Sequence, residues 1–266
     1  MLRPLFIAAL FFTMTPLLIF VQWLLEKLGV AGWGVIGVNY YRALCSVLGI
    51  RVRVVGEPVR DRAVLFISNH VSWADIVAIG SIAPIAYVSK SEIAGWPLVG
   101  TAAKSQRTVF VDRARRHQTG DAIAEIVKRL ASGTSVVLFA EGTSSDGNRV
   151  LPFRSALMGA VKEASARAES GILIQPMSIC YTGLNGIAMG RQHRPTVAWY
   201  GDLDFMPHIK AFIERGAVDA VVTYGEPIAA DGTADRKAMT KSLEGAVRKI
   251  TAATLRGRPR PLHGAK

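Results

Sequence analysis

The chain has 266 residues, half of them apolar, and its 32 Lys and Arg against 20 Asp and Glu give a formal charge of +12. The mean hydropathy of +0.27 is high for a soluble domain, so membrane contact is considered before any motif. The positive charge suits anionic lipid or nucleic acid. The only cysteines, Cys45 and Cys180, exclude a disulfide framework and a Cys-x-x-Cys metal site, and they fit a reducing, cytosol-facing compartment.

The first predicted element is an apolar segment, residues 4–25, that contains no charged residue. About 20 apolar residues are enough to cross a bilayer, so this segment is a transmembrane candidate. Pro16 in its middle predicts a kink or a break into two short helices. The next apolar stretch carries Arg42 and several glycines, which is typical of an interfacial helix. We therefore expect residues 1–50 to be membrane-anchoring helices, either spanning or inserted from one side, with a buried core helix as the alternative.

After residue 50, short β-branched runs alternate with amphipathic segments of helical length. This pattern predicts one α/β domain over residues 51–255, with a mixed but largely parallel sheet flanked by helices. The predicted strands are 52–55, 63–68, 86–89, 109–112, 135–140, 172–179, 196–200 and 220–224, and the predicted helices lie near 74–82, 117–132, 154–168, 207–215 and 235–255. The last residues, 256–266, are expected to form a basic, flexible tail.

Asn69 and His70 end an apolar strand abruptly, and Asp75 follows in the first turn of the next predicted helix. This arrangement would fold the carboxylate back toward the imidazole. An aspartate that accepts from one ring nitrogen leaves the other nitrogen free to take a proton, which is the base half of a catalytic triad. Ser72 does not resemble a nucleophile elbow, so the pair suits activation of a hydroxyl on the substrate. Alternatively, Asp75 caps its helix and His70 bonds a loop carbonyl.

Other common catalytic motifs are missing from the sequence. It contains no HExxH and no Gly-Lys phosphate loop, and the nearest match to GxSxG, residues 142–146, ends in Asp146. Zinc hydrolysis, P-loop chemistry and ordinary serine esterase chemistry therefore lose support.

Two further predicted strands also end in polar residues. Arg113 follows one of them, and Glu141, Gly142 and Thr143 follow the other. Together with the Asn69-His70 and Asp75 block and with residues 174–178, these blocks resemble in order and spacing the four motif blocks of the glycerolipid acyltransferase family, best known from the 1-acyl-glycerol-3-phosphate acyltransferases. The resemblance extends over about residues 50–180. The stretches 89–100 and 139–153 resemble more specifically the lyso-ornithine lipid acyltransferases of some bacteria, whose acceptor carries an amino-acid headgroup.

The resemblance implies a role for each motif residue. His70 would be the general base and Asp75 its orienting partner. The acceptor, especially its phosphate, would be bound by Arg113, by the turn of Glu141, Gly142 and Thr143, and by Arg154, although Arg154 is equally well read as a solvated arginine at a helix start. A guanidinium suits phosphate, and backbone N–H groups of a glycine turn can add donors. The chain departs from the family at Ala140 and Ser144, where Pro and Arg are usual.

The predicted function is acyl transfer without a metal or redox cofactor. The donor would be an acyl thioester of acyl carrier protein or coenzyme A, and the acceptor the free hydroxyl of 1-acyl-sn-glycerol-3-phosphate, giving phosphatidic acid. The alternatives are acylation of lyso-ornithine lipid and a non-catalytic, membrane-anchored protein that binds anionic lipid. Nucleic acid is not expected, because the basic residues are scattered and no nucleic-acid module is recognisable. The expected location is the cytoplasmic face of a bacterial inner membrane.

Overall fold

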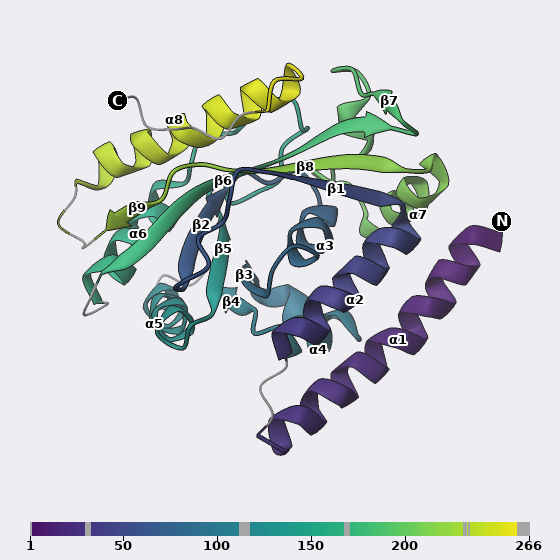
Figure 1. Cartoon of the computed structure of the whole chain (residues 1–266), viewed down its shortest axis with the longest axis horizontal. Coiled ribbons are helices and arrows are strands. Elements are labelled where there is room, and N and C mark those ends of the chain that lie inside the picture. The colour runs from purple at the N-terminus through teal and green to yellow at the C-terminus, as the bar shows by residue number, and fades with distance from the viewer. Residues whose placement is uncertain are drawn as a thin grey trace.

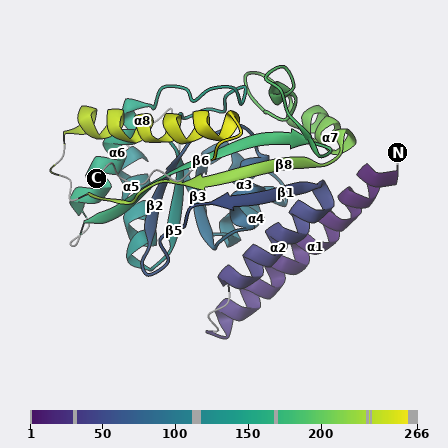
Figure 2. The same cartoon turned by 45° about the horizontal axis from the view of Figure 1, so that its top comes forward.

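The structure, a computed structural model, describes residues 2–29, 33–111, 118–167, 171–230, 233 and 235–259. A nine-stranded sheet forms the centre of the molecule, helices cover both of its faces, and two N-terminal helices lie side by side along one flank (Figures 1 and 2). The predicted fold class, a mixed α/β sheet flanked by helices, is confirmed.

The main path of the sheet has the order β1-β8-β6-β2-β5-β3-β4, and β7 and β9 pair with β6. The strands are β1 (Ile50–Val55), β2 (Val64–Ser68), β3 (Ile85–Lys90), β4 (Val109–Val111), β5 (Ser135–Phe139), β6 (Ile172–Leu184), β7 (Ile187–Ala188), β8 (Val218–Tyr224) and β9 (Ile228–Ala230). Parallel pairs join β2 to β5 and β6, β3 to β4 and β5, and β1 to β8, whereas β6 is antiparallel to β7, β8 and β9.

The helices bury the two faces of the sheet in separate hydrophobic clusters. They are α1 (Leu2–Lys27), α2 (Trp33–Leu48), α3 (Ala74–Gly80), α4 (Val99–Ser105), α5 (Gln118–Ala131), α6 (Ser155–Arg167), α7 (Phe205–Arg215) and α8 (Arg236–Leu255), with 3-10 turns η1 (Ser91–Gly95) and η2 (Arg194–Thr196). Residues of α5, α6 and α8 pack on one face, and residues of α2, α3 and α7 pack on the other. Successive strand residues such as Leu65 and Phe66 therefore enter different clusters, which explains the continuous apolar runs.

The structure corrects several sequence predictions. Residues 196–200 form the end of η2 and an irregular loop, not a strand; Val197 and Ala198 are apolar because they are buried, not because they pair. Strand β6 continues to Leu184, since it bends at a bulge after Tyr181 and stays paired with β8. Helix α4 and strands β7 and β9 were not predicted.

Helix α1 continues through Pro16, so the predicted break into two helices is wrong. Proline removes one backbone donor, but side-chain bonds hold the helix on either side of it. Thr15 Oγ1 lies 2.6 Å from Tyr40 Oη of α2, and Gln22 Oε1 accepts from Gln106 Nε2, at the end of α4, at 3.0 Å. One side of α1 is thereby tied to the rest of the molecule.

The other side of α1 is apolar and exposed. Its exposed large side chains are Leu5, Phe6, Phe12, Leu17, Phe20, Trp23 and Leu24. By length and composition alone, residues 5–25 could cross a membrane, a test that buried core helices and signal sequences also pass.

Candidate active site

The candidate site lies where β2 and β5 end side by side. The two strands are parallel, with Ser68 opposite Phe139, so the residues after them leave the sheet at the same edge. His70 follows β2, and Glu141 follows β5. The loop after β2 leads into α3, whose first turn carries Asp75.

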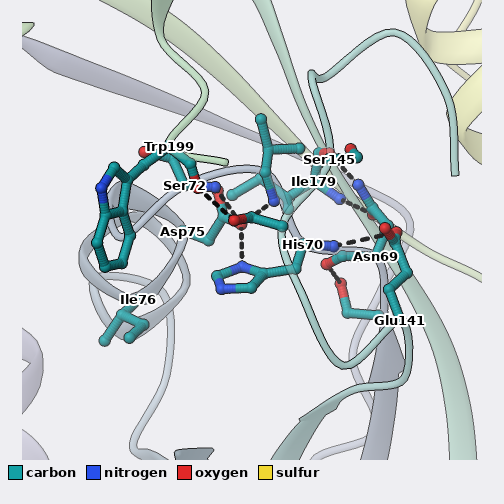
Figure 3. Close-up of polar contacts among 12 residues, drawn as sticks. Asn69, His70, Ser72, Asp75, Ile76, Glu141, Ser145, Ile179 and Trp199 are labelled. Carbon is teal, nitrogen blue, oxygen red and sulfur yellow. Dashed lines mark hydrogen bonds and ion pairs between the residues drawn. The ribbon is translucent and has the colours of Figure 1, made fainter. Parts of the chain in front are cut away.

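His70 and Asp75 form a hydrogen-bonded pair (Figure 3). The Nδ1 atom of His70 lies 2.8 Å from Oδ2 of Asp75. Because a carboxylate only accepts, this contact places the proton of a neutral imidazole on Nδ1 and leaves the lone pair on Nε2. Among the described residues, none hydrogen-bonds to Nε2, and the imidazole keeps 20% of its side-chain surface exposed. His70 can therefore take a proton from a molecule that reaches Nε2.

Asp75 is completely buried, with 0% exposure, and both of its oxygens are engaged. Besides His70, Oδ2 accepts from the backbone N–H of Val71 at 2.7 Å and of Ser72 at 3.1 Å. The hydroxyl of Tyr181 donates to Oδ1 at 2.8 Å. These donors replace the water that burial removes, so a negative charge can be held beside the imidazole.

The imidazole is held by packing as well as by Asp75. It stacks on the ring of Phe139, with centroids 4.1 Å apart and an angle of 18° between the planes. The nearby hydroxyl of Ser72 is buried and has no hydrogen-bond partner among the described residues, so it is not paired with His70 as a nucleophile would be. The geometry suits a base that acts on a substrate hydroxyl.

Glu141 hydrogen-bonds to the same loop. Its side chain is buried, at 1% exposure, and Oε1 accepts from the backbone N–H of His70 at 3.3 Å. Burial raises the pKa of Glu141 to about 8, although the backbone N–H groups of His70 and Leu151 oppose the shift. Glu141, which was predicted to bind the acceptor, thus hydrogen-bonds to the backbone of His70, the predicted base.

The turn after Glu141 brings together three more of the predicted residues. Gly142 has φ +70°, and a Cβ there would lie 2.9 Å from Cγ of Arg154, so the position requires glycine. Arg154 Nε donates to the carbonyl of Glu141 at 3.3 Å. Thr143 and Arg154 are exposed. Arg113 lies outside the described residues.

Two positions in the site carried no predicted role. The side chain of Asn69 makes two 2.9 Å hydrogen bonds to the backbone of Ile179 in β6, which fixes the start of the loop. Tyr181 lies two residues further along β6, beyond the predicted end of that strand. Asn69 stood in the quoted motif, so its place beside His70 was a usable signal, whereas no local pattern marks Tyr181.

Metal binding finds no support within the described part of the chain. There, no group of three or more His, Cys, Asp or Glu side chains is arranged to hold a metal ion. Reaction without a metal or cofactor stays a prediction from the sequence.

Comparisons with known proteins identify the family and the fold of the chain. Residues 51–180 match the family model described as Acyltransferase. The chain is 44% identical over 223 residues to a lyso-ornithine lipid O-acyltransferase of Brucella abortus, covering 84% of each protein. It is 42% identical to a protein of the same name from Rhizobium meliloti, covering 84% of this chain and 76% of that protein. The crystal structure of the 1-acyl-sn-glycerophosphate acyltransferase of Thermotoga maritima superposes with a TM-score of 0.65 at 21% identity, covering 95% and 93% of the two chains.

Proposed function

The chain belongs to the acyltransferase family and acylates lysolipids, and we propose that its acceptor is lyso-ornithine lipid. The observation that carries the chemistry is the geometry of His70: Nδ1 lies 2.8 Å from Oδ2 of Asp75, and no hydrogen bond to Nε2 is found within the described part of the chain. The donor in this proposal is an acyl thioester of acyl carrier protein or coenzyme A.

The proposed reaction is a single acyl transfer. Nε2 of His70 takes the proton of the acceptor hydroxyl as its oxygen attacks the thioester carbonyl carbon. The new C–O bond forms and the C–S bond breaks, and the departing thiolate receives the proton from the imidazolium. Asp75 stabilises the imidazolium that exists between the two proton transfers.

The proposed acceptor is not the one that the sequence analysis placed first. Phosphate-bearing 1-acyl-glycerol-3-phosphate was the first expectation and lyso-ornithine lipid the alternative, and the 44% and 42% identical relatives favour the alternative. The departure at Ser144 supports it. Ornithine attached through one nitrogen keeps a carboxylate and an amine, so the headgroup carries less negative charge than a phosphate monoester and needs fewer cations.

Ser144 also cannot replace the missing arginine as a free donor. Its hydroxyl donates to the backbone carbonyl of Trp199, in the loop that follows η2. A single arginine can still hold the carboxylate of an ornithine headgroup, because guanidinium binds carboxylate and phosphate in the same bidentate geometry. Arg113 therefore fits either acceptor, and the 1-acyl-glycerol-3-phosphate reading stays the second candidate.

The test is an acyl-transfer assay that offers both lysolipids in turn. Each is paired with acyl-(acyl carrier protein) and with acyl-CoA, and kcat/KM is compared across the four combinations. We expect the highest value with lyso-ornithine lipid. A higher value with 1-acyl-glycerol-3-phosphate would restore the first expectation, and binding of lipid without thioester consumption would favour the non-catalytic alternative.

We further propose that α1 attaches the enzyme to the membrane from one side. Its exposed face carries aromatic and aliphatic side chains, whereas Thr15 and Gln22 bond to α2 and to the end of α4. A helix that spans a bilayer has hydrocarbon around it for about 30 Å, and spanning would draw these attached elements into the hydrocarbon. Insertion in the plane of the interface buries the apolar face alone.

Single cysteines at the two ends of α1 distinguish the arrangements. Arg3→Cys and Lys27→Cys, at charged positions on either side of the apolar stretch and in a chain whose native cysteines are replaced, are exposed to a membrane-impermeant thiol reagent from the cytoplasmic side only. One-sided insertion predicts that both react under conditions in which the bilayer is intact. Reaction of one position alone would support a spanning helix.

A further inference from the structure

Tyr181 is a buried polar residue that none of the motif blocks includes. It lies in β6, with 2% of its surface exposed, and its hydroxyl donates to Oδ1 of Asp75 at 2.8 Å. Among the described residues, this is the one hydrogen bond that Oδ1 receives, whereas three donors surround Oδ2. The two oxygens of the same carboxylate are therefore fixed from different parts of the fold.

We propose that Tyr181 is a positioning residue for acyl transfer, which acts by holding the carboxylate of Asp75 in the orientation that fixes His70. The inference rests on the proposed role of His70 as the base. Tyr181 itself does not meet the substrate in this proposal, because its side chain is almost entirely covered.

The path of β6 supports this role. Ile179 and Tyr181 are two residues apart on the strand, so their side chains point to the same face of the sheet. Both belong to the cluster that packs against α3. Asn69 bonds to the backbone of Ile179, and the register of β6 against β8 shifts directly after Tyr181. The strand is thus attached to the His70 loop at one residue and to Asp75 at the next residue on that face.

The chemistry of the contact explains what the hydroxyl contributes. A carboxylate can turn about its Cβ–Cγ bond, and a turn would move Oδ2 out of line with Nδ1 of His70. A donor on Oδ1 opposes that rotation. Burial, helped by the charge of Asp75, raises the pKa of Tyr181 well above its usual value, so the hydroxyl stays protonated and can donate.

Tyr181→Phe removes the hydroxyl and keeps the ring. The expected result is a fall in kcat of about 10- to 100-fold, the range for one hydrogen bond to a charged group, with the KM for the lysolipid changed less than about 2-fold. Loss of binding alone would move KM instead. A kcat within about 2-fold of the wild type, in folded protein, would overturn the proposal.

Tyr87→Phe is the matched control. Tyr87 is also 2% exposed, and its hydroxyl donates at 2.9 Å to the backbone carbonyl of Ile76, in the same helix α3 that carries Asp75. Both variants therefore lose one buried hydrogen bond to α3, but only Tyr181→Phe loses one to the carboxylate. We expect similar melting temperatures for the two variants and a fall in kcat for Tyr181→Phe alone. Equal falls in kcat would indicate a general loosening of α3 and would contradict the inference.

A double-mutant cycle with Asp75→Asn tests whether Tyr181 acts through the carboxylate. In the Asp75→Asn background, Tyr181→Phe should change kcat less than about 2-fold, because there is no carboxylate left to orient. If the two effects multiply instead, Tyr181 acts independently of Asp75 and the proposal is wrong. A His70→Ala variant that keeps its activity would refute the proposed base, whereas an inactive His70→Ala with a fully active Tyr181→Phe would refute this inference alone.

Discussion

The two sides of the candidate active site are built in different ways. On the side of the base, Asp75 is fully buried, both of its oxygens accept hydrogen bonds, and the His70 ring is stacked on Phe139. On the side assigned to the acceptor, Thr143 and Arg154 are exposed. One side is fixed by the core, and the other is open to solvent.

The difference follows from what each side has to do. A general base is effective when it is held in place before the substrate arrives, so its partners belong to the sheet and to the backbone. A lipid headgroup has to enter and leave, so the groups that meet it need access. Changes on the buried side should therefore act on kcat and on stability, and changes on the exposed side should act on KM.

The largest effect is expected for His70→Ala. Removing the base should lower kcat by about 10²–10⁴-fold, the usual contribution of general base catalysis. Circular dichroism and sedimentation with lipid vesicles should match the wild type, because the imidazole is a partly exposed side chain in the loop after β2 and α1 is unchanged. A purified variant that keeps more than a few per cent of wild-type turnover would show that another group takes the proton.

The next effect is expected for Glu141→Gln and concerns stability. The folded pKa of Glu141 is about 8 and its ordinary value is 4.5, so the unfolded chain ionises first as the pH rises. The stability that this protonated carboxyl adds to the free energy of unfolding is fully present below pH 4.5 and is lost as the pH rises from 4.5 to 8. Glutamine does not titrate, so the free energy of unfolding of the variant should not fall in this way. Relative to the wild type, it should rise by an amount on the order of a few kcal/mol across that range.

The measurement for Glu141→Gln is denaturant unfolding of both proteins at pH 5 and at pH 8. The difference in unfolding free energy between variant and wild type should be more favourable to the variant at pH 8. A difference that does not change with pH would mean that the carboxyl is already ionised in the folded enzyme. The same variant sharpens the comparison, because a raised KM for the acceptor would show that this buried carboxyl also takes part in acceptor binding.

The sequence predicted the contact between His70 and Asp75, but it did not predict the residues that hold this pair in place. His70 and Asp75 are five positions apart in one strand–loop–helix unit, so their contact follows from local geometry. Tyr181 meets Asp75 across 106 positions, and Ile179 meets Asn69 across 110. Such contacts depend on the order of strands in the sheet, and the fold class alone does not give that order.

Burial also misled the secondary-structure prediction in one place. Residues 196–200 look like a strand because Val197 and Ala198 are apolar, yet they lie in a loop. In this loop the backbone N–H of Trp199 donates to the carbonyl of Val71 at 2.9 Å. This loop bonds to the segment that follows His70, so it belongs to the surroundings of the site rather than to the sheet. A short apolar run does not by itself distinguish the two cases.

Among the residues predicted to bind the acceptor, Arg113→Ala should raise the KM for the lysolipid about 10-fold, the effect of losing one charged hydrogen bond, while kcat changes little. Initial rates are measured over a range of acceptor concentrations at saturating donor. Arg113→Lys keeps the charge but loses the bidentate geometry, and it should lie between the wild type and the alanine variant. An unchanged KM would mean that Arg113 does not bind the acceptor.

The smallest effect is expected for Arg154→Ala. Its guanidinium is exposed, and Nε already donates to the carbonyl of Glu141, so the side chain has less left to offer a headgroup than an unengaged arginine would. We expect a rise in KM of about 2- to 5-fold, as for a solvent-exposed charge pair, that shrinks at high salt. Arg149→Ala, an exposed arginine in the same loop, is the control and should leave KM unchanged. If Arg154→Ala lowered kcat instead, its bond to Glu141 would connect the turn to the base, and the two sides of the site would not be separable.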